Sequence, residues 1–260
     1  MQIGLFDSGV GGLTILSSII KRLPKYNIYY VADNKYAPYG EKDREFIKER
    51  SFKIASYLIK NFDIKILVVA CNSATSAAIE DLRKEFSSIS IVGVEPGIKP
   101  AIEVTKSKNI AIMATPATLN GTKYKKLSKK ILKDKDINLI EQPCPNLAKL
   151  IEDGKASSKE TKELLKKWLT PMKEKKVDTI VLGCTHYPLI SKEIENFFDY
   201  PIQLIETGDA IAKRVLEISK QKGLKAPSHN SINIFSTAFL SNQIIKNILK
   251  INIPAKVISI

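Results

Sequence analysis

Two similar series of strands and helices follow one another along the chain, and this repetition is the feature that most constrains the fold. Candidate strands lie at 3–6, 28–32, 66–70 and 91–94 in the first series, and at 110–114, 137–141, 179–183 and 202–206 in the second. Partner strands are about 107 to 113 residues apart, and amphipathic helices fill the gaps. Short apolar strands that alternate with helices are typical of α/β proteins with parallel sheets. We therefore predict two pseudo-symmetric α/β domains with mostly parallel sheets.

The end of the chain adds one more strand, at 232–235, and one more helix after the second series is complete. We expect this last piece to return to the first half. The first domain is then discontinuous and covers 1–96 and 207–260, and the second covers 97–206. A chain of 260 residues is long enough for each half to bury a core.

A cysteine follows the third strand of each series. The strand "ILVVA" runs into "CNSAT" and the strand "TIVLG" runs into "CTHYP", so Cys71 and Cys184 occupy equivalent places. Ligands bind beyond the carboxyl ends of such strands, so facing halves would put the two thiols on opposite sides of a cleft. Two bases placed in this way could remove a proton from one face of a carbon and return one to the other, which is racemisation or epimerisation. The alternative is that Cys71 is a small buried hydrophobic residue.

The neighbours of the two cysteines suit proton transfer. A cysteine is a base only as thiolate, and amides at a helix start or nearby donors can lower its ordinary pKa of about 8.5. His186 could hold or relay a proton beside Cys184, since its pKa is ordinarily near neutral. Asp7 could play the matching part beside Cys71. The alternatives are that Asp7 and Ser8 cap the next helix and that His186 is structural.

Hydroxyl and amide side chains surround the same strand ends and could bind carboxylates, because helix N-termini with such donors form anion sites. These candidates are Ser8, Asn72, Ser73, Thr75, Thr115, Thr118 and Thr185. Cys144 is flanked by prolines and has no equivalent cysteine, so we interpret it as a packing residue. His229 lies in an expected loop and receives no role.

Composition excludes several classes of protein. Hydrophobic residues make up 44%, and no apolar run approaches the ~20 residues that span a bilayer. We expect no signal peptide, because the first residues lack a basic segment followed by an apolar stretch. Three cysteines cannot all pair within one chain, which favours a reducing cytoplasm. The net charge is +14, but only five of the 41 basic residues are arginine and no nucleic-acid motif is present. We therefore interpret the lysines as solvated helix faces that attract small anions.

Four sequence blocks resemble the signatures of the glutamate racemase family. They are "FDSGVGG" (6–12), "APYG" (37–40), "ACNSAT" (70–75) and "LGCTHYPLI" (182–190), and they follow the family's order over essentially the whole chain. The resemblance implies two α/β domains that close over a buried site, and interconversion of L- and D-glutamate without any cofactor. It also implies a supply of D-glutamate for peptidoglycan. Family members are often dimers, and some require a cell-wall precursor as activator. A homodimer and a cell-wall activator are therefore both possible partners of this chain.

The resemblance also implies roles for individual residues. Cys184 acts on L-glutamate and Cys71 on D-glutamate, with Asp7 and His186 assisting their thiols. Substrate contacts are implied for Asp7, Ser8, Tyr39, Gly40, Asn72, Ser73, Thr185 and His186, with Thr115 and Thr118 joining at the carboxylates. Glu152 is implied as a supporting partner behind them. Ser73 stands where the family usually has threonine, which keeps the hydroxyl and loses a methyl group.

Three other functions compete with this one. The first is a racemase for aspartate or hydantoins, against which the "CTHYP" block argues. The second is a zinc-binding protein that uses Cys71, Cys184 and His186, although no C-x₂-C pair is present. The third is a binding protein without catalysis, which would hold nucleic acid through the +14 charge and show steep salt dependence.

Overall fold

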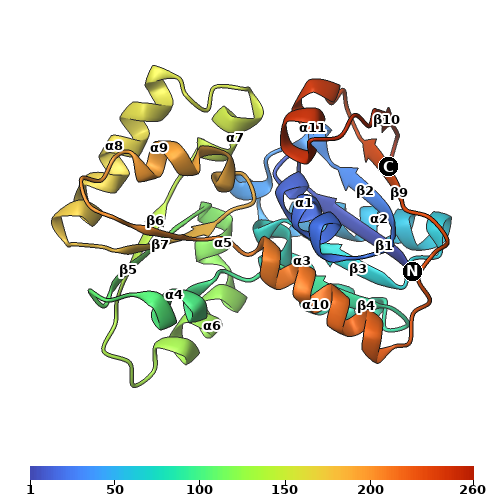
Figure 1. The fold of residues 1–260 in the computed structure, drawn as a ribbon, viewed down its shortest axis with the longest axis horizontal. Coiled ribbons are helices and arrows are strands. Elements are labelled where there is room, and N and C mark those ends of the chain that lie inside the picture. The colour runs from blue at the N-terminus through green and yellow to red at the C-terminus, as the bar shows by residue number, and fades with distance from the viewer.

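The chain folds into two α/β lobes, each built on its own parallel sheet (Figure 1). The structure is a computed structural model that describes residues 1–260. The six-stranded sheet of the first lobe contains β1 (Gln2–Asp7), β2 (Asn27–Ala32), β3 (Ile66–Val69), β4 (Ser90–Gly93), β9 (Ser231–Ser236) and β10 (Ala255–Val257). The four-stranded sheet of the second lobe contains β5 (Asn109–Ala114), β6 (Asn138–Pro143), β7 (Thr179–Gly183) and β8 (Gln203–Ile205).

The strand order confirms the repeat that the sequence indicates. The first lobe runs β10-β9-β2-β1-β3-β4 and the second runs β6-β5-β7-β8, so each series places its strands in the order second, first, third, fourth. All neighbouring strands pair in parallel. The last strand and helix expected after the second series are present as β9 and the helix at 242–249. The structure adds one element that the sequence analysis did not predict, the short strand β10, which extends the sheet beyond β9.

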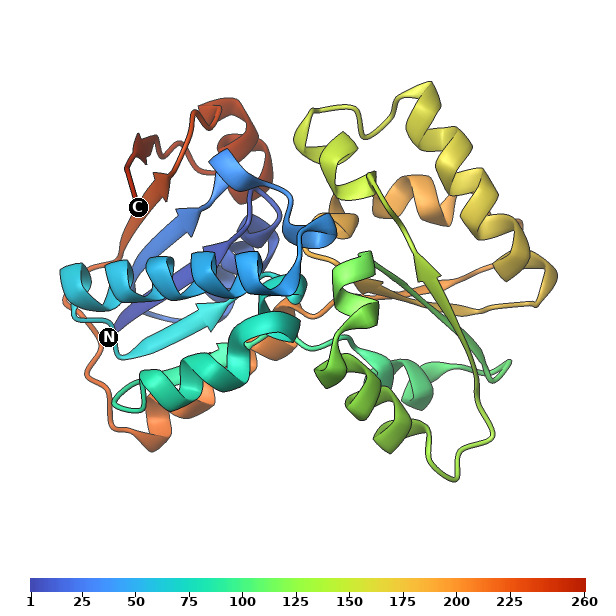
Figure 2. The same cartoon turned by 180° about the vertical axis from the view of Figure 1, so that it is seen from behind.

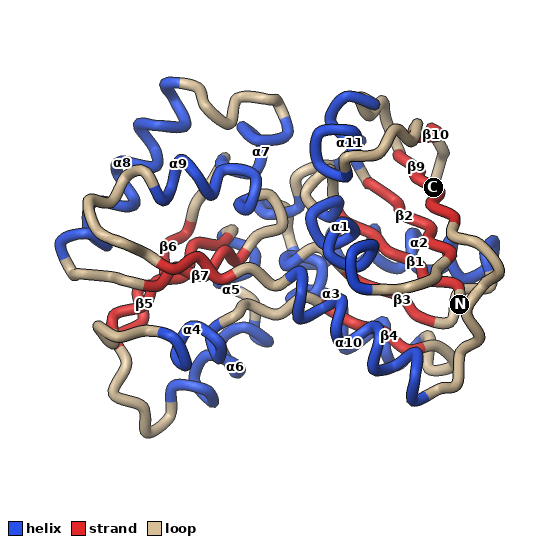
Figure 3. The backbone as a smooth tube through the Cα atoms, in the orientation of Figure 1, coloured by secondary structure: helices blue, strands red, loops and turns tan.

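Helices cover both faces of each sheet, so the layers alternate helix, strand, helix (Figure 3). On the first sheet α1 (Gly12–Arg22), α10 (Gly208–Gln221) and α11 (Asn242–Leu249) lie on one face, and α2 (Arg44–Phe62) and α3 (Asn72–Glu85) lie on the other (Figure 2). On the second sheet α7 (Leu147–Glu152), α8 (Lys159–Glu174) and α9 (Ser191–Glu195) face α4 (Ile98–Val104), α5 (Pro116–Asn120) and α6 (Thr122–Leu132) across the strands. Three short 3-10 turns complete the chain, η1 (Asn34–Tyr36), η2 (Tyr39–Glu41) and η3 (Tyr187–Ile190).

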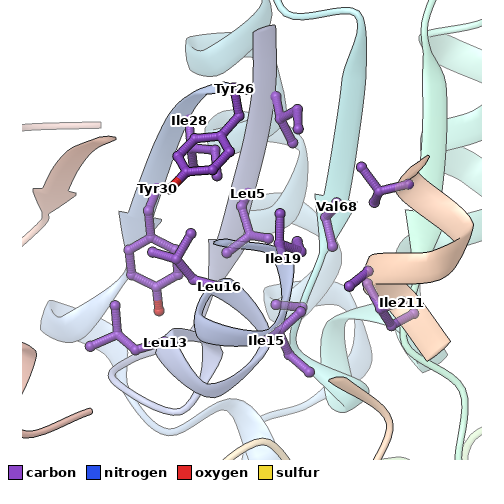
Figure 4. Close-up of a cluster of buried hydrophobic side chains, with 14 of the residues drawn as sticks. Leu5, Leu13, Ile15, Leu16, Ile19, Tyr26, Ile28, Tyr30, Val68 and Ile211 are labelled. Atoms are coloured by element: carbon purple, nitrogen blue, oxygen red, sulfur yellow. The ribbon is translucent and has the colours of Figure 1, made fainter. Parts of the chain in front are cut away.

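Apolar periodicity explains why these elements pack as they do. Helix α1 buries Leu13, Leu16 and Ile19, which recur at helical spacing and face the sheet. They meet side chains of the central strands, including Leu5 and Tyr30, in the cluster drawn in Figure 4. A stripe of this kind stabilises a helix mainly through packing against its neighbours.

In each series, the helix that follows the fourth strand packs on the other lobe. Helix α4 follows β4 of the first sheet but packs on β5 and β7 of the second. Helix α10 follows β8 of the second sheet but packs on α1 of the first. The chain therefore passes twice between the lobes, once in each direction. The central strands β1, β3, β5 and β7 end at this junction, which places their following residues together.

None of the helices is both long enough and apolar enough to cross a membrane.

Candidate active site

A small cavity lies where the carboxyl ends of the central strands of the two lobes meet. It is lined by Ser8, Pro38, Gly40, Cys71, Asn72, Ser73, Thr115, Ala148, Cys184, Thr185 and His186. The structure thus brings together both cysteines and most of the residues that the sequence analysis selected. Pro38 and Ala148 are additional lining residues. The space inside is about 10 Å³, which holds about one water molecule.

Cys71 ends the turn after β3 and caps helix α3. Its Sγ accepts a hydrogen bond from the Ala74 N–H at 3.5 Å and lies 3.9 Å from Oγ of Ser8. Burial raises the pKa of the Cys71 thiol, the Asp7 carboxylate raises it further, and the Ala74 N–H lowers it. Burial outweighs the helix amides that the sequence analysis expected to lower this pKa. Cys71 is therefore held as a protonated thiol in the closed site.

Cys184 follows β7 and has a different partner. Its Sγ lies 3.6 Å from Nδ1 of His186, and Nε2 of the same ring lies 2.6 Å from Oε1 of Glu152. Burial lowers the pKa of His186, but Glu152 and Cys184 raise it more, so that the pKa stands well above its ordinary value of 6.5. A protonated imidazole is thus held against the Cys184 sulfur.

Glu152 also connects the two lobes. It lies at the end of α7, and its Oε1 accepts the Val10 N–H of the first lobe at 2.7 Å as well as the His186 Nε2 hydrogen bond. The backbone of Gly11 comes equally close to the second lobe. A Cβ atom at Gly11 would lie 2.4 Å from Oγ1 of Thr185, which leaves room for glycine only.

Asp7 lies behind the cavity and orients its wall. The Gly9 N–H and the Ser8 hydroxyl donate to its Oδ1 at 2.9 Å and 3.2 Å, and the Thr185 hydroxyl donates to its Oδ2 at 3.0 Å. Burial raises the pKa of Asp7, against the effect of His186, which lowers it. The alternative that Asp7 and Ser8 cap the next helix is wrong, because helix α1 begins at Gly12 and no side chain caps it.

Three hydroxyl groups meet across the lobes on the other side of the cavity. Oγ of Ser73 lies 3.0 Å from Oγ1 of Thr115 and 3.5 Å from Oγ1 of Thr118. Asn72 lies beside them, and its side-chain Nδ2 is buried without a hydrogen-bond partner. A buried donor without a partner is costly, so this amide is available to an acceptor on a ligand.

Two of the expected binding residues point elsewhere. The Thr75 hydroxyl donates to the Val69 carbonyl and accepts the Val94 N–H, so it joins strand ends and does not line the cavity. The Tyr39 side chain is fully buried, and its hydroxyl donates to Oδ2 of Asp33. Its neighbours Pro38 and Gly40 reach the cavity instead.

Sequence reasoning missed the ion pair that holds this tyrosine. Arg50 binds Asp33 through two hydrogen bonds of 2.9 Å, and the two side chains are 4% and 0% exposed. Asp33 directly follows β2, and Asp7 is the last residue of the neighbouring strand β1, so an acidic residue at the end of each strand is a pattern that could have identified Asp33. Arg50 lies three residues after Ile47 and four before Ile54, so the apolar spacing of α2 also places it on the buried face.

The remaining cysteine and histidine lie away from the site. Cys144 packs in the core of the second lobe, as expected, and its Sγ donates to the Gln142 carbonyl at 3.4 Å. His229 lies in an exposed loop and contacts Ser228. No cluster of three or more His, Cys, Asp or Glu side chains has an arrangement that could hold a metal ion.

A larger cavity of about 370 Å³ lies beside the site, between α2, α3, α5 and α6. Its wall contains no thiol and no histidine. The paired thiols therefore identify the smaller cavity as the candidate active site, because size alone provides no proton-transfer groups.

Comparisons with known proteins find chains and solved structures similar to this one. Residues 11–215 match the model of the Asp/Glu/Hydantoin racemase family. The chain is 52% identical over 250 residues to a glutamate racemase of Aliarcobacter butzleri, with 96% of each chain covered. A solved glutamate racemase isoform from Bacillus anthracis is 33% identical with a TM-score of 0.85, covering 99% of this chain and 97% of that one. The Escherichia coli glutamate racemase, solved with L-glutamate and the activator UDP-MurNAc-Ala, is 30% identical with a TM-score of 0.79, covering 96% and 94%.

Proposed function

We propose that Cys71 and Cys184 are the two proton-transfer groups of this chain, which belongs to the Asp/Glu/Hydantoin racemase family and interconverts L- and D-glutamate. One observation carries the proposal. The two thiols follow equivalent strands of the two lobes, β3 and β7, and line one small cavity. This is the arrangement that two bases on opposite faces of one carbon require.

Each direction of the reaction uses one thiolate and one thiol. From L-glutamate, the Cys184 thiolate takes the α-proton, and the Cys71 thiol gives its proton to the opposite face of the carbon. Cys184 then carries the proton and Cys71 is left as thiolate, which is the starting state for D-glutamate. The raised pKa of Cys71 supports its role as the proton donor for L-glutamate.

His186 and Asp7 assist the two thiols unequally. His186 lies 3.6 Å from Sγ of Cys184, and its protonated imidazole stabilises the Cys184 thiolate that takes the α-proton. Glu152 keeps the imidazole protonated and in place from its other side. Asp7 acts less directly, since its carboxylate orients Ser8 and Thr185 on the two sides of the cavity.

Hydroxyl and amide groups bind the substrate in this proposal. Asn72 Nδ2 has no partner in the protein and suits a carboxylate oxygen, with Ser73 and Thr115 beside it. Removing an α-proton next to a carboxylate builds negative charge, which preorganised donors in a site without bulk water stabilise. General acid–base groups alone contribute about 10²–10⁴-fold, so these donors supply much of the remainder. The residues present need no cofactor for either proton transfer.

We also propose that the lobes are domains with the boundaries given by the sequence, 1–96 with 207–260, and 97–206. Each sheet has its own buried clusters, which supports the division. Closure of the two domains would exclude water from the cavity, which has room for about one water molecule in this state.

Activation and assembly are proposals of the same kind. The Escherichia coli relative was solved with the activator UDP-MurNAc-Ala, which supports a test of that compound as an activator here. A homodimer is proposed because members of the family are often dimers. Light scattering of the purified protein at several concentrations, with and without glutamate, tests it. The product D-glutamate serves bacterial peptidoglycan, which suits an enzyme of the cytoplasm.

The decisive experiment uses purified protein and L-glutamate in D₂O. Optical activity and deuterium at Cα are followed together, and the reaction is repeated from D-glutamate. We expect both to change at linked rates from either enantiomer. Racemisation without deuterium gain, or no change at all even with UDP-MurNAc-Ala added, contradicts the two-thiol mechanism.

A further inference from the structure

Glu41 belongs to the same short turn, η2, as the cavity residue Gly40, and its side chain reaches the other lobe. Its Oε1 accepts the backbone N–H of Asn146 at 2.5 Å. Asn146 precedes helix α7 in a left-handed backbone conformation with φ of 63°. The Glu41 side chain is exposed and takes part in no salt bridge, so this contact between the lobes is its one specific interaction.

Helix α7 is the element that the contact holds. Ala148 on this helix lines the cavity, and Glu152 at its end binds Nε2 of His186. Glu152 also accepts the Val10 N–H of the first lobe. The helix is therefore tied to the first lobe at both ends, by Glu41 at its start and by Val10 at its end.

We propose that Glu41 is a positioning residue for racemisation, whose hydrogen bond to Asn146 holds the cavity-lining segment 38–40 against α7 when the lobes close. The inference rests on the proposed site between the lobes. A carboxylate that accepts a backbone N–H forms a charge-assisted bond. Because an open form leaves Glu41 and Asn146 to bind water instead, the bond favours the closed form alone.

The expected effect is on substrate affinity and is the same for both enantiomers. A protein that is closed for a smaller fraction of the time binds its ligand less tightly by that fraction. Glu41 touches neither thiol, so it has no reason to act on one direction of proton transfer only. This distinguishes Glu41 from His186, which lies beside the Cys184 thiol, and from Asp7, which orients Ser8 and Thr185.

The test compares Glu41→Ala and Glu41→Gln with Glu45→Gln, an exposed glutamate of α2 with no partner. Loss of one such hydrogen bond should raise KM about five- to tenfold for both L- and D-glutamate in Glu41→Ala, with kcat within about twofold. Glu41→Gln keeps an acceptor oxygen and should stay within about threefold of the wild type. Glu45→Gln should match the wild type.

Hydrogen exchange at Asn146 gives a second readout that needs no turnover. The Asn146 amide should exchange about five- to tenfold faster in Glu41→Ala than in the wild type, and the Glu45→Gln control should show no change. Equal protection of Asn146, or a KM that stays at the wild-type value in both directions, overturns the inference. So does a loss of kcat in one direction only. A wild-type protein that does not racemise glutamate overturns the proposed function instead.

Discussion

Sγ of Cys184 lies 3.6 Å from Nδ1 of His186, whereas the equivalent thiol, Cys71, has only the Ser8 hydroxyl at 3.9 Å and the Ala74 N–H at 3.5 Å. The two halves of the site thus share a strand order but differ in chemistry. The difference suits a resting state in which Cys71 carries a proton. It also means that the two thiols are separable by experiment.

Replacing either thiol by a hydroxyl should stop racemisation. Cys71→Ser and Cys184→Ser are each expected to lower kcat by at least ~10³-fold in both directions, because inversion needs both groups and a serine hydroxyl is a far weaker acid. Circular dichroism of glutamate measures the rate. Cys144→Ala is the control, since Cys144 lies in the core of the second lobe, and it should stay within about threefold of the wild type.

The same two variants show which thiol acts on which face of the α-carbon of glutamate. Cys71→Ser keeps Cys184 and should exchange the α-proton of L-glutamate with D₂O without inversion, and Cys184→Ser should do this with D-glutamate. Mass spectrometry of the recovered amino acid measures the exchange. The opposite pairing would show that the proposed faces are reversed.

The pairing of His186 with Glu152 predicts a pH-dependent loss of stability in Glu152→Gln. Burial lowers the pKa of His186, but Glu152 and Cys184 raise it overall, well above 6.5. A pKa raised by folding stabilises the protein fully below the unfolded value, and the stabilisation is lost as the pH rises through the folded value. The loss in free energy of unfolding should therefore be about 2 kcal/mol at low pH and shrink towards high pH.

Urea unfolding at several pH values from 6 to 10, on the wild type and on Glu152→Gln, tests this prediction. Glu103→Gln, an exposed residue of α4, provides the control and should show a small difference at every pH. A loss in Glu152→Gln that is equal at all pH values would mean that the Val10 hydrogen bond, rather than the charge on His186, carries the effect.

The fold and the thiols could be predicted because they depend on patterns that a sequence displays. Alternating apolar runs place the strands within one or two residues of the structure, and the position of Cys71 and Cys184 after equivalent strands places both in one cavity. The directions of Tyr39 and Thr75 could not be predicted in this way. Both follow or flank cavity residues, but they lie on helical turns, where successive side chains point in different directions, and each side chain has a buried partner elsewhere.

The buried Asp33–Arg50 pair should contribute much more to the free energy of unfolding than an exposed ion pair on helix α2 does. Arg50→Met leaves the buried Asp33 carboxylate without its counter-charge, which should cost about 3–5 kcal/mol of unfolding free energy. Lys53→Met on α2 breaks an exposed pair with Glu49 and should cost less than about 1 kcal/mol. Urea denaturation measures both.

A second variant separates charge from packing at this pair. Asp33→Asn combined with Arg50→Met removes both charges and should be less destabilising than Arg50→Met alone. Because the Tyr39 hydroxyl donates to Asp33, KM for glutamate should rise in all variants that disturb the pair. A double variant as unstable as the sum of its single changes would refute the role of the unpaired charge.

Gly40→Ala should separate the lobes without unfolding either one. A Cβ atom at Gly40 would lie 2.6 Å from Cγ2 and 2.8 Å from Cβ of Thr115, and these two residues belong to opposite lobes. The clash is relieved by opening the cavity, while the core of each lobe stays intact. We expect kcat/KM to fall about 10²-fold, since a small misplacement at a site can cost this much. The thermal midpoint should change by only about 2–4 °C.

The double variant Gly40→Ala with Thr115→Ser shows whether the contact itself is responsible. Serine keeps the hydroxyl that meets Ser73 and removes Cγ2, the atom nearest to the added Cβ. Measured against Thr115→Ser alone, the added alanine should therefore cost less activity than it does in the wild type. An alanine that costs the same in both backgrounds would place the damage in the turn around Gly40, and full activity of Gly40→Ala would show that catalysis does not need the close approach of the two lobes.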